Sequence, residues 1–126
     1  MRALITALFI TALATTASAH EGHDKKAKTG TLTGEVIDIT CYLDHESSGE
    51  KHAACAQKCI TAGNPVGILA NDIVYVVVMG SHESPNAKLA PFAGKLVKVT
   101  GKQIEKDGIH AIDLETIAPA DPAPKK

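Results

Sequence analysis

CYLDHESSGEKHAACAQKC, residues 41–59, contains all three cysteines of the chain and two of its six histidines. Its second half predicts a helix over residues 50–62, ended by a glycine and an Asn-Pro pair. Cys55 and Cys59 lie one turn apart in this helix, and His52 lies on the same arc. Alanine and isoleucine side chains share that arc, so we expect the thiols to face inward, towards the surface on which the helix packs.

A strand is predicted before the helix, and a loop over residues 44–49 separates the two. Residues 31–43, TLTGEVIDITCYL, mostly alternate between apolar and polar side chains and are rich in β-branched residues, with a bulge expected near Gly34. Cys41 lies at the end of this strand. We therefore expect folding to bring Cys41 up to Cys55 and Cys59 and to form a site for a soft metal ion there.

The rest of the chain predicts four more strands. Asn71-Asp72 separates two apolar runs and indicates a hairpin, and the second run, IVYVVVM, is apolar on both faces and should be the most buried strand. His110 alternates with apolar residues on the last strand and is expected to face solvent. The four runs are Val66–Ala70, Ile73–Met79, Gly94–Ile104 and Ile109–Ile117, with a turn or short helical piece at Lys88–Ala93.

Five bent strands and one long helix predict a mainly β fold. Closing them as a small five-stranded OB-like barrel is the most economical arrangement, because closure leaves no free strand edge. An open α+β sheet is the alternative.

The two ends of the chain differ from this domain. Residues 1–19 are typical of a secretory signal peptide, with an apolar stretch followed by the small-residue pattern Ala17-Ser18-Ala19. Residues 20–30 read as a flexible His/Lys-rich tail, residues 31–117 as the domain, and residues 118–126 as a disordered Pro/Ala-rich tail. We expect a periplasmic protein whose mature chain has no membrane span.

The cysteines and histidines of the central stretch predict a metal site. Thiolate sulfur favours Cu(I) and Zn(II), and imidazole binds both metals. Cys41, Cys55 and Cys59 would supply three ligands, and either His52 on the helix or His45 on the loop before it would supply the fourth. We expect copper, or else zinc, in a protein that buffers the ion or transfers it to another exported carrier or a membrane protein.

A second copper site is predicted at the start of the mature chain. If cleavage follows Ala19, the free amine and imidazole of His20 can chelate Cu(II), and His23 can add a nitrogen. A carrier with two copper sites would combine this chelate with the thiolate site.

The odd number of cysteines leaves a second hypothesis open. In an oxidising compartment, Cys41 could form a disulfide with Cys55 or with Cys59 and leave one buried thiol. The chain would then be a secreted binding or interaction module that holds no metal.

Other classes of function are disfavoured. The chain has no Trp, two Tyr and two Phe, and its formal net charge is −1. OB-like barrels that bind single-stranded nucleic acid use stacked aromatic side chains in a basic groove, so nucleic acid is not an expected partner. The sequence contains no C-x-x-C redox pair, nucleophile elbow, phosphate loop or cluster of paired carboxylates, and we do not expect an enzyme.

Four motifs, GEVIDITCYL, HAACAQKCITAGNPVGIL, GKLVKVTG and DGIHAI, make residues 31–117 similar to small exported bacterial OB-like domains with a Cys/His helix insert. The resemblance implies the barrel and the pattern C…HxxCxxxC, and it implies no particular activity. The histidine-led tail is similar in style to periplasmic copper-binding proteins.

Overall fold

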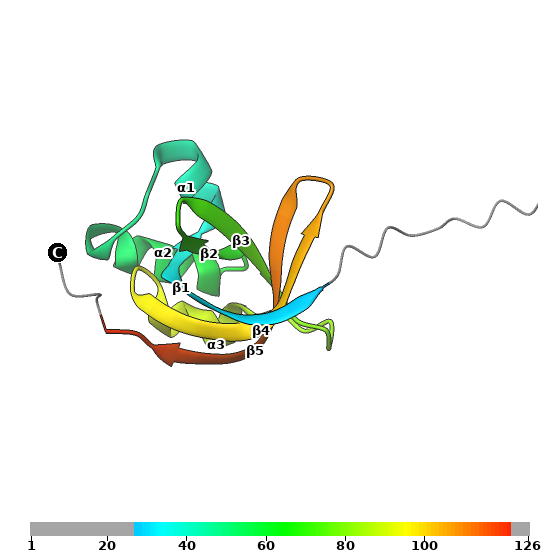
Figure 1. The fold of residues 1–126 in the computed structure, drawn as a ribbon. Helices are drawn as coiled ribbons and strands as arrows, with labels where there is room; N and C mark the ends of the chain where they lie inside the picture. The colour runs from blue at the N-terminus through cyan, green and yellow to red at the C-terminus, as the bar shows by residue number, and fades with distance from the viewer. Residues whose placement is uncertain (1–26, 122–126) are drawn as a thin grey trace, which may run out of the picture.

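The computed structural model describes residues 27–121. Its elements in chain order are β1 (Lys28–Asp38), α1 (Ile39–His45), the 3₁₀ helix η1 (Glu50–His52), α2 (Ala53–Thr61), β2 (Val66–Ala70), β3 (Ile73–Val78), α3 (Asn86–Leu89), the 3₁₀ helix η2 (Ala90–Phe92), β4 (Leu96–Lys106) and β5 (Ile109–Pro119). The strands form one sheet in the order β1-β2-β3-β5-β4, and pairing of β4 with β1 closes this order into a ring (Figure 1). The mainly β prediction with five strands is confirmed.

The first strand and its helix differ from the prediction. β1 ends at Asp38, and the residues expected to continue it to Leu43 form α1 instead. The Asp38 side chain accepts a hydrogen bond of 3.0 Å from the backbone N–H of Thr40, which is the geometry of a helix N-cap. This cap outweighs the strand preference of the β-branched residues that follow. The described domain therefore contains three short α-helices rather than one.

The expected bulge is also displaced. The register shifts between Thr100 and Gly101, where β4 pairs with β5, and not near Gly34. Gly34 instead marks a close crossing of β1 and β2, because a Cβ at this position would collide with the backbone carbonyl of Leu69.

The apolar core fills the ring. The most deeply buried side chains come from β1, β2, β4, β5 and the helices, and Val77 is the one buried residue of β3. The prediction that β3 is the most buried strand is therefore wrong, since its first half lies where the ring opens to solvent. The core residues with no exposed surface are Val36, Ile60, Ile68, Leu89, Val97, Val99 and Ile112.

The prediction for His110 is wrong as well. Its ring is half-buried and packs edge-on against Tyr75, with centroids 5.7 Å apart. Because side chains two residues apart share one face of a strand, His110 lies on the same face as the buried Ile112 and Leu114. This is the inner face of the ring.

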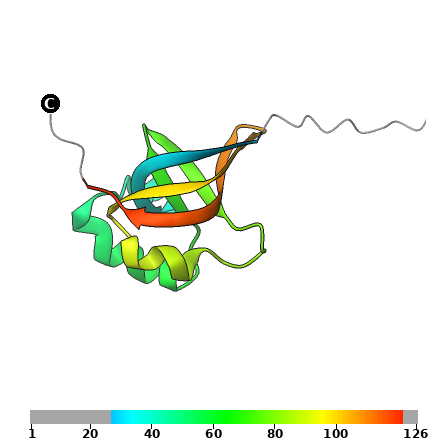
Figure 2. The ribbon, with the colours of Figure 1, turned by 60° about the horizontal axis from the view of Figure 1, so that its bottom comes forward.

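Two helices lie together against one side of the ring. Figure 2 shows α2 and α3 side by side below the strands, and α2 contacts both α3 and η2. The Asn86 side chain of α3 donates hydrogen bonds of 2.7 Å to the carbonyl of Ile60 and 2.8 Å to that of Asn64. These bonds fix the last turn of α2 and hold that helix in place.

The predicted signal peptide and most of the predicted tail, including His20 and His23, lie outside the described residues. β1 begins at Lys28, so the last three residues of the predicted tail belong to the domain, and β5 continues two residues past Ile117. No helix in residues 27–121 is long and apolar enough to cross a membrane.

Candidate metal centre

Three sulfurs gather where α1 meets α2. Cys41 comes from α1, and Cys55 and Cys59 come from successive turns of α2. Their Sγ atoms all lie within 4.8 Å of one another, and all three cysteines are free thiols. We call these residues the cysteine cluster. The prediction that folding brings Cys41 up to the other two is confirmed, although Cys41 arrives on a helix and not on a strand.

Backbone contacts fix α1 at both ends. At its start, the N–H of Ile39 donates to the carbonyl of Pro65 over 3.0 Å, which ties α1 to the segment after α2. At its end, Glu46 takes a left-handed conformation (φ 53°) and its N–H donates to the carbonyl of Tyr42 over 2.8 Å. The Glu35 carboxylate then accepts the N–H of Gly49 and anchors the loop to β1. Cys41 is thereby held facing α2.

The cluster lies at the surface, contrary to the prediction of inward thiols. Cys55 is exposed, and Cys41 and Cys59 are half-buried. The reason is the face that α2 buries. Ala56 and Ile60 point into the core. Each cysteine precedes one of them, and a step of one residue turns the side chain about 100° around the helix. An ion at the cluster would therefore be reachable from solvent, first at Cys55.

Asp38 adds a carboxylate that the sequence reasoning missed. Its side chain is 1 % exposed, and both oxygens face the side-chain nitrogen of Asn64, at 3.4 and 3.3 Å. Besides capping α1, this carboxylate interacts with the thiols of Cys41 and Cys59. The sequence does contain a signal for this role, because Asp38 is an acidic residue between two isoleucines and comes three residues before Cys41.

The surroundings of the cluster raise the pKa of two of its thiols, Cys41 and Cys59. Hydrogen bonding to Asp38, burial, and repulsion by that carboxylate together raise the pKa of Cys41 from 9.0 to about 12. Burial is the main cause that raises the pKa of Cys59, and negative charge at Cys55 and Asp38 adds to it, while hydrogen bonding with the Cys41 thiol acts in the opposite direction. A cation would relieve this repulsion, because it favours the thiolate form of each ligand.

The histidines predicted as fourth ligands lie outside the cluster. His45 ends α1, and its Nε2 lies 2.9 Å from the Asp44 carboxylate in a largely exposed pair, with side chains 70 % and 72 % exposed. His52 is exposed in η1, before the first turn of α2. The structure therefore gathers three sulfurs and a neighbouring carboxylate, and neither imidazole belongs to the group.

Comparisons with models of protein families, with curated proteins and with solved structures find no match to this chain.

Proposed function

We propose that this protein is a periplasmic metal-binding protein that buffers or transfers a soft ion, Cu(I) in preference to Zn(II), through Cys41, Cys55 and Cys59. The observation that carries the proposal is the convergence of the three Sγ atoms within 4.8 Å. Metal–sulfur bonds of ~2.3 Å place the sulfurs of one site about 3.8 to 4.0 Å apart, so small side-chain adjustments suffice to bind an ion.

Copper is preferred because of the ligands available. Structural zinc sites are closed by four ligands, whereas the cluster offers three sulfurs from two helices. Soft thiolates select Cu(I), which is satisfied by fewer ligands than zinc needs. The exposure of Cys55 supports a role in transfer, since an incoming thiolate from a partner can reach the ion there without unfolding of the domain.

The wider setting is part of the same proposal. We propose that the five-stranded ring is an OB-like barrel, that the chain is exported, and that it acts as a carrier and not as an enzyme. Another exported metal carrier or a membrane protein would then receive the ion, and the amine and imidazole of His20 would form a second, Cu(II)-binding site.

The test is the metal content and Cu(I) affinity of the exported protein, with Cys55→Ser as the variant. Ala54→Ser is the matched control, because it places the same side chain on the exposed surface of α2 without removing a sulfur. We expect one tightly held ion in the wild type and in Ala54→Ser, and at least a hundredfold weaker Cu(I) binding in Cys55→Ser. Equal metal in all three proteins would reject the site.

The second candidate is an interaction module with a structural disulfide between Cys41 and Cys55 or Cys59. The short separations among the sulfurs favour it as well. Mass mapping of freshly isolated protein under non-reducing conditions separates the two candidates. A quantitative Cys41 bridge, together with no metal uptake after mild reduction, would select the disulfide.

A further inference from the structure

The ring of strands opens at the end away from the cysteine cluster. β3 and β5 pair only over three positions, from Val76 opposite Ala111 to Val78 opposite Asp113. Before these positions the two strands separate, and the V-shaped opening beside the β4–β5 hairpin is visible in Figure 1. A cavity of about 410 Å³ lies there, within the range of small-molecule sites. We call it the mouth cavity.

Polar side chains occupy the inner face of the sheet at this cavity. In the antiparallel pairs, Lys28 is opposite Gln103 and Glu105 is opposite His110. Gln103 is in turn opposite Ile112, which is fully buried in the core, so this face of the sheet points inward. The inner face thus changes from apolar in the core to polar at the mouth. Polar residues at positions that would otherwise build a core indicate a functional role.

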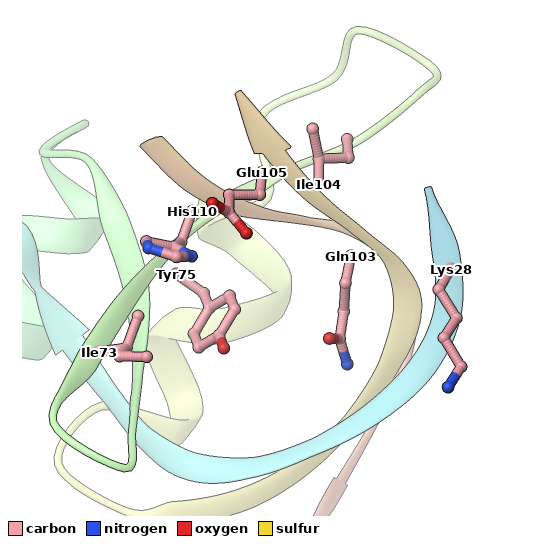
Figure 3. A pocket seen from close by; sticks show the side chains of 7 residues that line it. All are labelled: Lys28, Ile73, Tyr75, Gln103, Ile104, Glu105 and His110. Carbon is pink, nitrogen blue, oxygen red and sulfur yellow. The ribbon is translucent and has the colours of Figure 1, made fainter. Parts of the chain in front are cut away.

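These polar groups have no side-chain partner among the described residues. Across residues 27–121, no side-chain hydrogen bond or ion pair joins Lys28, Gln103, Glu105 or His110 to another residue. Lys28 and Glu105 have opposite charges and line the same cavity without pairing. Figure 3 shows the ammonium of Lys28 and the carboxylate of Glu105 on separate sides, with the Gln103 amide between them.

An apolar wall completes the mouth cavity. Tyr75 and His110 pack edge to face at an interplanar angle of 66°, and Ile73 lies beside them (Figure 3). Tyr75 is packed against the core, so its ring is held in position. Gln103 lies over Gly30, where a Cβ would come within 2.7 Å of its side-chain nitrogen. The absence of a side chain at Gly30 therefore leaves room for the amide.

We propose that the mouth cavity binds a small zwitterion, namely a free amino acid or short peptide with an apolar side chain. Lys28 pairs with the ligand carboxylate, Glu105 pairs with its ammonium group, and Gln103 hydrogen-bonds its amide or carboxylate. The apolar side chain packs on Tyr75 and Ile73. This site is separate from the cysteine cluster and does not depend on a bound metal ion.

The test is titration of the protein with the dipeptide phenylalanyl-leucine, followed by amide chemical shifts in NMR spectra. Shifts are expected at the mouth cavity and not at the cysteine cluster, with and without metal. N-acetylation or C-amidation of the dipeptide removes one charge, and each should weaken binding at least fivefold.

Variants that remove the charge of Lys28 or Glu105 test which residue binds which end of the ligand. Lys28→Gln should weaken binding of the free dipeptide at least fivefold and leave binding of the C-amidated dipeptide unchanged. Glu105→Gln should weaken binding of the free dipeptide by the same factor and leave binding of the N-acetylated dipeptide unchanged. Lys98→Gln and Glu115→Gln are matched controls, because they remove the same charges from exposed side chains of β4 and β5 that do not line the cavity. Absence of shifts at millimolar dipeptide, or equal binding by all variants, overturns the proposal.

Discussion

Asp38 combines two roles that are usually separate, since one buried carboxylate caps α1 and also raises the pKa of a thiol in the cysteine cluster. The cap requires a side-chain oxygen, which asparagine also supplies. Two causes of the raised pKa of Cys41, the charge-assisted hydrogen bond to the carboxylate and the repulsion by its charge, depend on a negative charge that asparagine lacks. The Asp38→Asn variant therefore separates the structural role from the electrostatic one.

We expect Asp38→Asn to keep the fold and to lower the pKa of Cys41 from about 12 towards its ordinary 9.0. Alkylation of Cys41 near pH 9, followed by residue-specific mass spectrometry of the metal-free protein, should be at least tenfold faster in the variant.

The raised pKa of Cys41 also makes the stability of the fold depend on pH. A thiol with a raised pKa stabilises the fold while it is protonated, and this contribution is lost as the pH rises from 9.0 to about 12. The thermal midpoint should fall less steeply over this range in Asp38→Asn, and an unchanged slope would contradict the assignment.

At the scale of elements, the spacing of Cys55 and Cys59 was sufficient to predict that they share a helix face. It was not sufficient to predict their exposure, because the buried face depends on what packs against α2, and the core takes Ala56 and Ile60 instead. α1 was missed because its first residues, Ile39 and Thr40, continue a strand-like alternation. The convergence of the cysteines was still predictable. Cys41 comes only three residues after Asp38, where β1 ends, so the predicted strand and the observed helix both bring its thiol close to α2.

The N-terminus of α2 depends on a single glycine. Gly94 has a φ of +70°, and a Cβ there would approach the Cβ of Ala53 to 2.6 Å. Gly108 has a similar φ of +82° with open space around it, which makes Gly108→Ala a matched control.

Both alanine variants should lose about 1–2 kcal/mol of folding free energy for the left-handed backbone. Gly94→Ala should lose a further ~1–3 kcal/mol because α2 is pushed away. Urea unfolding measures both, and Cu(I) affinity should fall only in Gly94→Ala, since only this change displaces Cys55. Equal losses of folding free energy in the two variants would show that α2 does not pack against Gly94.

At the scale of the whole molecule, the cysteine cluster is coupled to the core, because Cys59 and the fully buried Ile60 are adjacent on α2. An ion that binds the folded chain in preference to the unfolded chain stabilises it, by about 2.7 kcal/mol at a free concentration of 100 Kd. Removing the ion with a chelator should therefore lower the thermal midpoint of the wild type by several degrees. Cys55→Ser should show no such difference, and a chelator effect of equal size in that variant would place the stabilising ion elsewhere.

Closure of the strand order also protects the protein from self-association through the edges of its sheet. A sheet with a free edge presents unpaired N–H and C=O groups that recruit strands from neighbouring chains into fibrils. Each of the five described strands has a partner on both sides, and the short pairing between β3 and β5 is the contact that completes this arrangement. If that contact opened, β3 and β5 would each present a new edge, and self-assembly would compete with the native fold.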